Sequence, residues 1–197
     1  MNYLAHLLLA EDTPESLIGN FLGDFVKGTL EGQKNCYSEG ILKGIRTHRH
    51  IDSFTDSHSI YRNSKRRISA NQRHCSGIVI DVCYDHFLSR HWTRFSESSL
   101  NEFIAKVYRI LHNHQELLPQ KLQNVLPRMI AENWLGTYQH SEGVGLTLTR
   151  ISRRLRRQNS LATAQDDFLL HYDELERDFL AFFPALLTYT EQNRHSF

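Results

Sequence analysis

The sequence predicts an all-α protein folded as a single-domain helical bundle. Apolar residues recur at intervals of three and four along most of the chain, which is the spacing of a helix with one buried face. The one run of β-branched residues, Ile78 to Ile80, continues into a longer helical pattern instead of ending at a turn. Repeats, low-complexity tracts and linkers are absent from the 197 residues, so we expect one domain over 1–197.

In the first part of the chain, apolar spacing and residues typical of a helix N-terminus predict where the helices lie. An apolar stretch over 3–10 comes first and contains His6. Asp12 and Pro14 then mark a helix start, because an acid before a helix and a proline in its first turn are both favoured. Apolar residues at helical spacing extend this helix over 16–26.

The same spacing of apolar residues, three and four apart, predicts the later helices. Their expected ranges are 38–53, 78–92, 100–118 and 162–190. The run at 78–80 is interpreted as the buried start of its helix, since it flows into the next residues without a break. Pro119 lies beyond the end of the helix before it, and Pro184 is expected to kink the last one.

The composition excludes several classes of protein. Lys and Arg total 23 against 22 Asp and Glu, so the chain does not coat nucleic acid through overall charge. Three cysteines without CxxC spacing fit a reducing compartment. The N-terminal apolar stretch lacks a preceding basic region, and no run approaches the roughly 18 apolar residues of a membrane span. We expect a soluble cytoplasmic protein that binds neither membrane nor nucleic acid.

Acids and histidines gather at three places in the first half of the chain. The groups are Asp24; His48 with Asp52; and Asp81 with Asp85 and His86. Residues four apart project from one helix face about one turn apart, while His86 lies about 100° round the helix from Asp85. Carboxylates and imidazoles together bind divalent ions such as Mn²⁺, Fe²⁺ or Zn²⁺. The spacing leaves open an alternative, an ion-pair network with Arg46, Arg49 and Arg90.

A metal at these groups would indicate hydrolytic chemistry. A bound divalent ion lowers the pKa of water and polarises a phosphoryl oxygen. The phosphate-loop pattern GxxxxGK[ST] and the serine-nucleophile pattern GxSxG do not occur in the sequence. Metal-activated water is therefore the nucleophile that the sequence favours.

Several long blocks of the chain share one resemblance. The blocks are MNYLAHLLLA, SLIGNFLGDFVKG, GIRTHRHIDSFTD, DVCYDHFLSRHW and the closing HYDELERDFLAFFP. Together and in this order they resemble the acyl carrier protein phosphodiesterase family, also called holo-acyl-carrier-protein hydrolases. The stretch DHFLSRHW is the most specific of them, and the match runs along the whole chain.

The resemblance implies a fold related to the HD-type phosphohydrolases and a divalent metal, manganese before magnesium or iron. The implied reaction cleaves the phosphodiester between 4′-phosphopantetheine and a serine of acyl carrier protein. The implied metal ligands are Asp24, His48, Asp81, Asp85 and His86, and the implied catalytic residues are His6, His91 and Asp52. His86 and Asp52 either bind the ion or support residues that do, while His6 and His91 contact phosphate or transfer a proton to the leaving oxygen.

An acyl carrier protein is acidic, so its enzyme needs a basic face. Arg150, Arg153, Arg154 and Arg157 fall on one helical stripe, to which Arg156 adds a further charge. We expect this stripe to bind the protein substrate, although an ordinary solvated helix face has the same pattern. A second basic stretch covers 62–73.

Two other functions compete with this prediction. A metal-dependent hydrolase of a small nucleotide or phosphoester would use the same acids and histidines. A helical binding module would instead use them as structural ion pairs and its arginines for nucleic acid. Few aromatic residues interleave the arginine stripe, which disfavours single-stranded RNA as its ligand.

Overall fold

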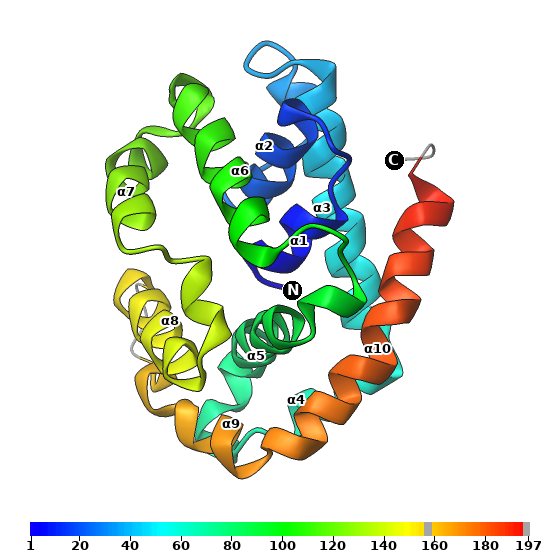
Figure 1. Ribbon diagram of the computed structural model, residues 1–197, viewed down its shortest axis with the longest axis vertical. Helices are drawn as coiled ribbons and strands as arrows, with labels where there is room; N and C mark the ends of the chain where they lie inside the picture. The colour runs from blue at the N-terminus through cyan, green and yellow to red at the C-terminus, as the bar shows by residue number, and fades with distance from the viewer. Residues whose placement is uncertain (156–158, 195–197) are drawn as a thin grey trace.

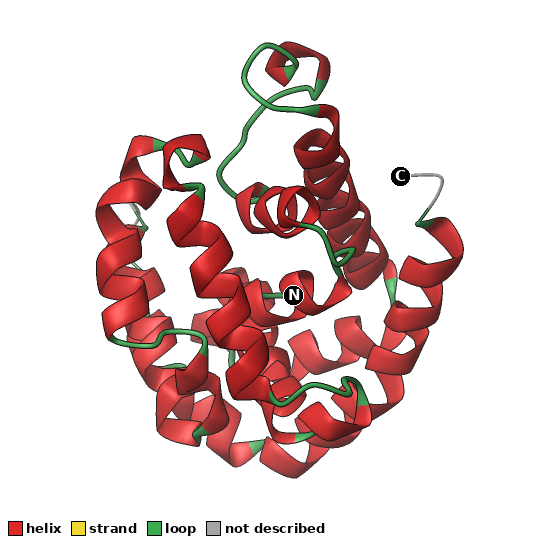
Figure 2. Cartoon of the chain, turned by 45° about the horizontal axis from the view of Figure 1, so that its top comes forward, coloured by secondary structure: helices red, strands yellow, loops and turns green. Residues whose placement is uncertain are grey.

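The computed structural model describes residues 1–155 and 159–194, and in this part the chain forms ten α-helices and no strand (Figure 2). The helices are α1 (Tyr3–Leu9), α2 (Pro14–Leu22), α3 (Glu39–Ser57), α4 (Ser59–Arg67), α5 (Ser76–Arg90), α6 (Leu100–Asn113), α7 (Gln120–Ala131), α8 (Ser141–Arg154), α9 (Gln165–Leu170) and α10 (Tyr172–Asn193). Short 3₁₀ turns connect several of them. The all-α prediction is confirmed.

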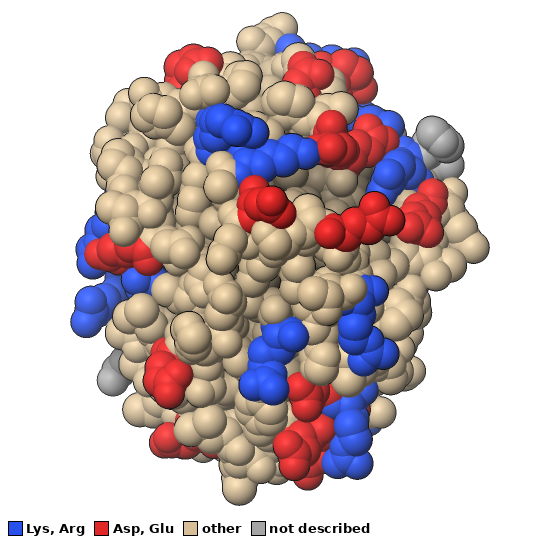
Figure 3. Space-filling model, viewed as in Figure 1, with Lys and Arg blue, Asp and Glu red and all other residues tan. Residues whose placement is uncertain are grey.

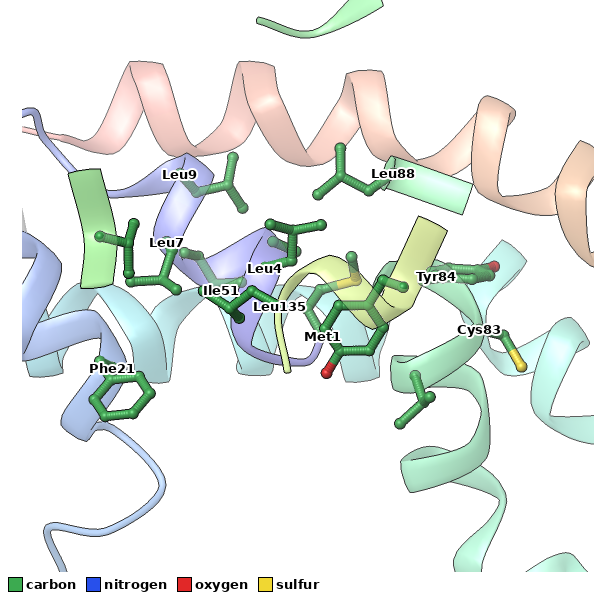
Figure 4. Close-up of a cluster of buried hydrophobic side chains, with 14 of the residues drawn as sticks. Met1, Leu4, Leu7, Leu9, Phe21, Ile51, Cys83, Tyr84, Leu88 and Leu135 are labelled. Carbon is green, nitrogen blue, oxygen red and sulfur yellow. The ribbon is translucent and has the colours of Figure 1, made fainter. Parts of the chain in front are cut away.

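Helices α1 and α5 lie in the middle of the molecule, with the other helices around them (Figure 1). Along α5, Val79, Val82 and Phe87 are fully buried. The close-up of the core shows side chains of α1 and α5 among the same group of apolar residues (Figure 4). Met1 belongs to this core, which places the N-terminal amino group inside the protein.

The β-branched run at 78–80 is part of α5, as the sequence analysis expected. Its helix begins at Ser76, packs against neighbours on most of its surface, and needs no polar face. A helix buried on nearly all sides reads as a continuous apolar run, which is why this segment resembles a strand locally.

The expected helix over 162–190 is divided in the structure. A 3₁₀ turn at Leu161–Thr163 and the short α9 come first, and α10 begins only after His171. The division lets Phe168 and Tyr172 both pack against Phe87 of α5 as the chain turns (Figure 1). No Gly or Pro marks the turn, so helical spacing alone did not reveal it. The helix expected over 100–118 likewise ends at Asn113, before a 3₁₀ turn.

Helices α2 and α3 approach each other very closely through glycines. A Cβ added at Gly19 would lie 2.3 Å from the Ile41 carbonyl oxygen, and one at Gly44 would lie 2.8 Å from the Ser16 carbonyl oxygen. Any side chain at either position would push the helices apart. This contact fixes where the later turns of α3 meet the end of α2.

Acidic and basic side chains are interspersed on the face seen in Figure 3, in keeping with a formal net charge of +1. In the described part of the chain, no helix is both long enough and apolar enough to cross a bilayer.

Candidate functional site

His48 is the best-anchored side chain of the candidate site. It lies on α3, and its Nδ1 is 2.8 Å from the Asn20 carbonyl oxygen, to which it donates. A Cβ at Gly23 would lie 2.1 Å from Cγ of His48, so only glycine leaves room for the ring there. With Nδ1 occupied, Nε2 faces Asp52 at 3.1 Å and Asp24 at 3.6 Å.

His6 of α1 stacks on this ring. The two ring centroids are 3.7 Å apart and the planes differ by 14°. Nε2 of His6 lies 3.1 Å from Asp52, while its buried Nδ1 has no hydrogen-bond partner in the described structure. His6, His48 and Asp52 form a group of possible metal ligands whose donor atoms lie within 4.8 Å of one another.

The N-terminal ammonium extends this group, and together they form a row whose members are Asp24, His48, His6, Asp52, the Met1 ammonium and Asp81. The Met1 ammonium lies 2.9 Å from Asp81 and 3.7 Å from Asp52, so it bridges two carboxylates. The Tyr61 hydroxyl donates to the same Asp81 oxygen at 2.8 Å. Burial raises the pKa of Asp81, and the ammonium and the hydroxyl oppose that effect.

The acids of the row stabilise positive charge on the groups beside them. Burial lowers the pKa of His48, but Asp24 and Asp52 outweigh it and raise that pKa to about 9. Burial lowers the pKa of His6 to about 4, helped by the neighbouring His48. The pKa of Asp52 is held well below its usual range by the two rings and Met1, against the effect of burial. The two acids thus stabilise the protonated form of His48.

Asp85 makes a different kind of contact. It is fully buried, and its two oxygens accept hydrogen bonds from the backbone N–H groups of Leu4 at 2.7 Å and Ala5 at 3.2 Å. These are N–H groups of the first turn of α1, which have no acceptor within their own helix. Asp85 therefore caps α1 from α5, and α1 carries Met1 and His6. Burial raises the pKa of Asp85 to about 7, and the two backbone donors oppose that rise.

His86 and His91 lie apart from this row. Nδ1 of His86 is 2.8 Å from the Tyr138 carbonyl oxygen, and Nε2 is 3.0 Å from the Tyr172 hydroxyl. Nε2 of His91 is 2.8 Å from Glu176 on α10. Burial lowers the pKa of His86 to about 4. The structure thus joins His6, Asp24, His48, Asp52 and Asp81, while Asp85, His86 and His91 contact other parts of the protein.

A cavity of about 900 Å³ opens beside the row. Asp24, Asp52 and Asp81 line it together with Met1 and Tyr61. Apolar side chains form a further part of its wall, namely Phe25, Ile78, Val82, Ile151 and Leu155. Its remaining charged lining consists of Asp56 and the cations Lys27, Lys121 and Arg154. The site is therefore a row of acids and imidazoles beside an open, partly apolar cavity.

The predicted arginine stripe divides between different environments. Arg150 pairs with Glu132 at 2.9 Å and lies over the Trp134 ring, 4.6 Å from its centroid. Arg153 and Arg154 are both exposed, and of these two Arg154 lines the cavity. Arg156 and Arg157 lie outside the described residues.

Sequence reasoning missed several residues of the site. Met1, Tyr61, Lys27 and Lys121 belong to it only because distant segments converge, and no local pattern marks them. Gly23 did carry a signal, because a glycine directly before an acid at a helix end is suited to a close approach.

Comparisons with known proteins identify the family of this chain. The pattern of the family described as acyl carrier protein phosphodiesterase matches residues 1–186. A protein of that name from Yersinia enterocolitica is 35% identical over 195 residues, covering 98% of this chain and 100% of its own. Those from Photorhabdus laumondii and Klebsiella pneumoniae strain 342 are 33% and 32% identical, covering 97% and 98% of this chain and 96% and 100% of their own.

No solved structure matches the chain, so its expected relation to the HD-type phosphohydrolases stays a prediction. The family pattern covers nearly the whole chain, and the curated relatives span it from end to end. The chain belongs to the acyl carrier protein phosphodiesterase family.

Proposed function

We propose that this chain hydrolyses the phosphodiester that joins 4′-phosphopantetheine to a serine of acyl carrier protein. The products are the apo-protein and free 4′-phosphopantetheine. The observation that carries the proposal is that Asp52 belongs both to the possible ligand group and to the cavity wall, in a chain of this family. A reacting ester in the cavity would lie next to the acids and imidazoles.

The residues present fit a divalent metal ion. His48 donates its Nδ1–H to Asn20, which leaves the lone pair of Nε2 as a metal donor. The unpartnered Nδ1 of buried His6 is a second free donor atom. We propose that His6, His48 and Asp52 hold the ion, and that Asp24 and Asp81 complete its surroundings. Manganese is the proposed ion because the family resemblance implies it, and the carboxylates of the group suit it.

When bound, the ion activates water and neutralises charge on the phosphoryl oxygens. Asp52 lies 3.1 Å from Nε2 of both imidazole rings, so the three side chains face one another. Asp85 keeps α1 in place and so sets the positions of His6 and Met1. Tyr61 and the Met1 ammonium fix one oxygen of Asp81. We propose that His86 and His91 stabilise the packing around α5 and α10, away from the reacting ester.

The cavity suits a substrate with a long, partly apolar arm. Its apolar lining would contact the pantetheine chain, while the carrier protein stays outside. We propose that exposed basic residues near the cavity attract that acidic protein. Arg153 of α8 and Arg62 and Arg66 of α4 are exposed and suit this role. The cysteines described are all free, in keeping with the cytoplasm as the proposed compartment.

Intact-mass spectrometry of holo-acyl carrier protein tests the proposal. With this protein and Mn²⁺ we expect a loss of about 340 Da, the mass of the phosphopantetheine group released when water cleaves the ester. EDTA should abolish the loss. An unchanged mass, together with turnover of a small chromogenic phosphodiester, would instead support a hydrolase of small phosphoesters.

A further inference from the structure

Three cations from distant parts of the chain line the same cavity as the acids. Lys27 follows α2, Lys121 lies in the first turn of α7, and Arg154 is the last residue of α8. Their convergence is produced by the tertiary fold alone. The cavity is therefore lined by charges of both signs.

These three cations have no acidic partner among the described residues. Some other cations are paired, as Lys43 is with Glu11 at 2.8 Å and Arg150 with Glu132 at 2.9 Å. Burial raises the pKa of Tyr3, another residue of the cavity wall, and the nearby guanidinium of Arg154 opposes that rise. Arg154 thus lies at the cavity wall beside Tyr3, without an acidic partner among the residues that the structure describes.

We infer that Lys27, Lys121 and Arg154 bind the phosphate group of the ligand through its non-bridging oxygens. On the side of the acid and imidazole row, the positive groups already face carboxylates: the Met1 ammonium lies at Asp52 and Asp81, and His48 lies at Asp24 and Asp52. Guanidinium and ammonium groups form short, charge-assisted hydrogen bonds with phosphate oxygens. A phosphate in the cavity would therefore meet its side-chain cations on the wall formed by Lys27, Lys121 and Arg154.

The inference assigns Arg154 a role different from its neighbour Arg153. Both belong to the stripe that the sequence offers for protein docking, but only Arg154 lines the cavity. Which phosphate compound binds there rests on the proposed function. Binding of phosphate itself does not, so the two claims can fail separately.

The test is calorimetric titration of metal-free protein with 4′-phosphopantetheine and with inorganic phosphate. Arg154→Gln, Lys121→Gln and Lys27→Gln should each weaken binding, with about tenfold or more for Arg154 because a charge-assisted pair is lost. Arg153→Gln, next to it on the same helix, should leave affinity for both probes within about twofold. Arg154→Lys should recover part of the loss, since it restores charge without the planar fork.

Circular dichroism and thermal unfolding establish that each variant is folded. Equal affinity of Arg154→Gln and the unaltered protein would overturn the inference, as would an equal loss in Arg153→Gln or no phosphate binding by the unaltered protein. If phosphate binding depends on Arg154 while holo-acyl carrier protein is not cleaved, the anion site stands and the proposed function fails.

Discussion

Two groups of histidines lie close to α5, and they differ in what their ring nitrogens meet. His6 and His48 face Asp52 through Nε2, beside an open cavity. His86, on α5 itself, has one nitrogen at a backbone carbonyl and the other at a tyrosine hydroxyl, among packed aromatic rings. Both ring nitrogens of His86 therefore already have partners within the protein. A histidine in an acid-rich motif is therefore a candidate metal ligand only if one of its ring nitrogens still faces other possible metal ligands.

Replacing histidine by alanine should have very different effects on turnover in the two groups, and the larger loss is expected at His48. His48→Ala removes a donor atom that the whole α2–α3 contact positions, so we expect kcat/KM for holo-acyl carrier protein to fall about 10³-fold or more, beyond the 10–100-fold typical of lost supporting contacts. Intact-mass assays of the apo-product measure it. Activity within tenfold of the unaltered protein would remove His48 from the proposed ligand set.

Gly23→Ala sharpens the comparison without touching a charged group. The added Cβ would lie within 2.1 Å of the His48 ring, so the ring must shift. A displacement of about 1 Å can cost on the order of 10²-fold in rate, which is the loss we expect. The protein should stay folded by circular dichroism. Gly32→Ala is the matched control, because a Cβ there would meet only Thr29 Oγ1 at 3.5 Å, an ordinary contact, and it should leave the rate nearly unchanged.

His86→Ala should act on stability instead. It leaves the Tyr138 carbonyl and Tyr172 hydroxyl without their partner and opens a cavity among Phe87 and Phe168. We expect the free energy of unfolding to fall by about 2–4 kcal/mol, measured by urea unfolding. Turnover at a temperature where the variant is folded should remain within a few-fold. A loss as large as that of His48→Ala would restore His86 to the reacting site.

Asp85→Asn tests the link between the two groups. The amide can accept from only one of the two α1 N–H groups and places its own NH₂ against the other. We expect a loss of about 1–2 kcal/mol in unfolding free energy, as for a lost helix cap. Because α1 carries His6, turnover should fall moderately, whereas metal affinity should change less than in His48→Ala. Unchanged stability would contradict the capping role.

The sequence predicted the all-α class and the position of α5, because helical spacing and apolar runs are patterns among residues that are close together in the chain. It also identified Asp24, His48 and Asp52, whose spacing survives folding since two of them share one face of α3. It grouped His86 with Asp81, although positions five apart on a helix point in directions about 140° apart. Asp81 faces Met1, whereas His86 faces Tyr138.

The rest of the site depends on convergence that no local pattern encodes. Met1 reaches Asp81 across 80 positions in the sequence, and Tyr61 reaches it from α4. Lys27, Lys121 and Arg154 meet only at the cavity. The spacing of the arginines correctly indicated a helix. It did not reveal that Arg150 pairs with Glu132 while Arg154 lines the cavity.

The most direct test of this account is a calorimetric titration of Mn²⁺ into the metal-free protein and its two histidine variants. We predict that the unaltered protein and His86→Ala bind the ion with similar affinity, and that His48→Ala binds it far more weakly or not at all. Metal binding that survives in His48→Ala and is lost in folded His86→Ala would contradict the assignment of the metal to α1 and α3.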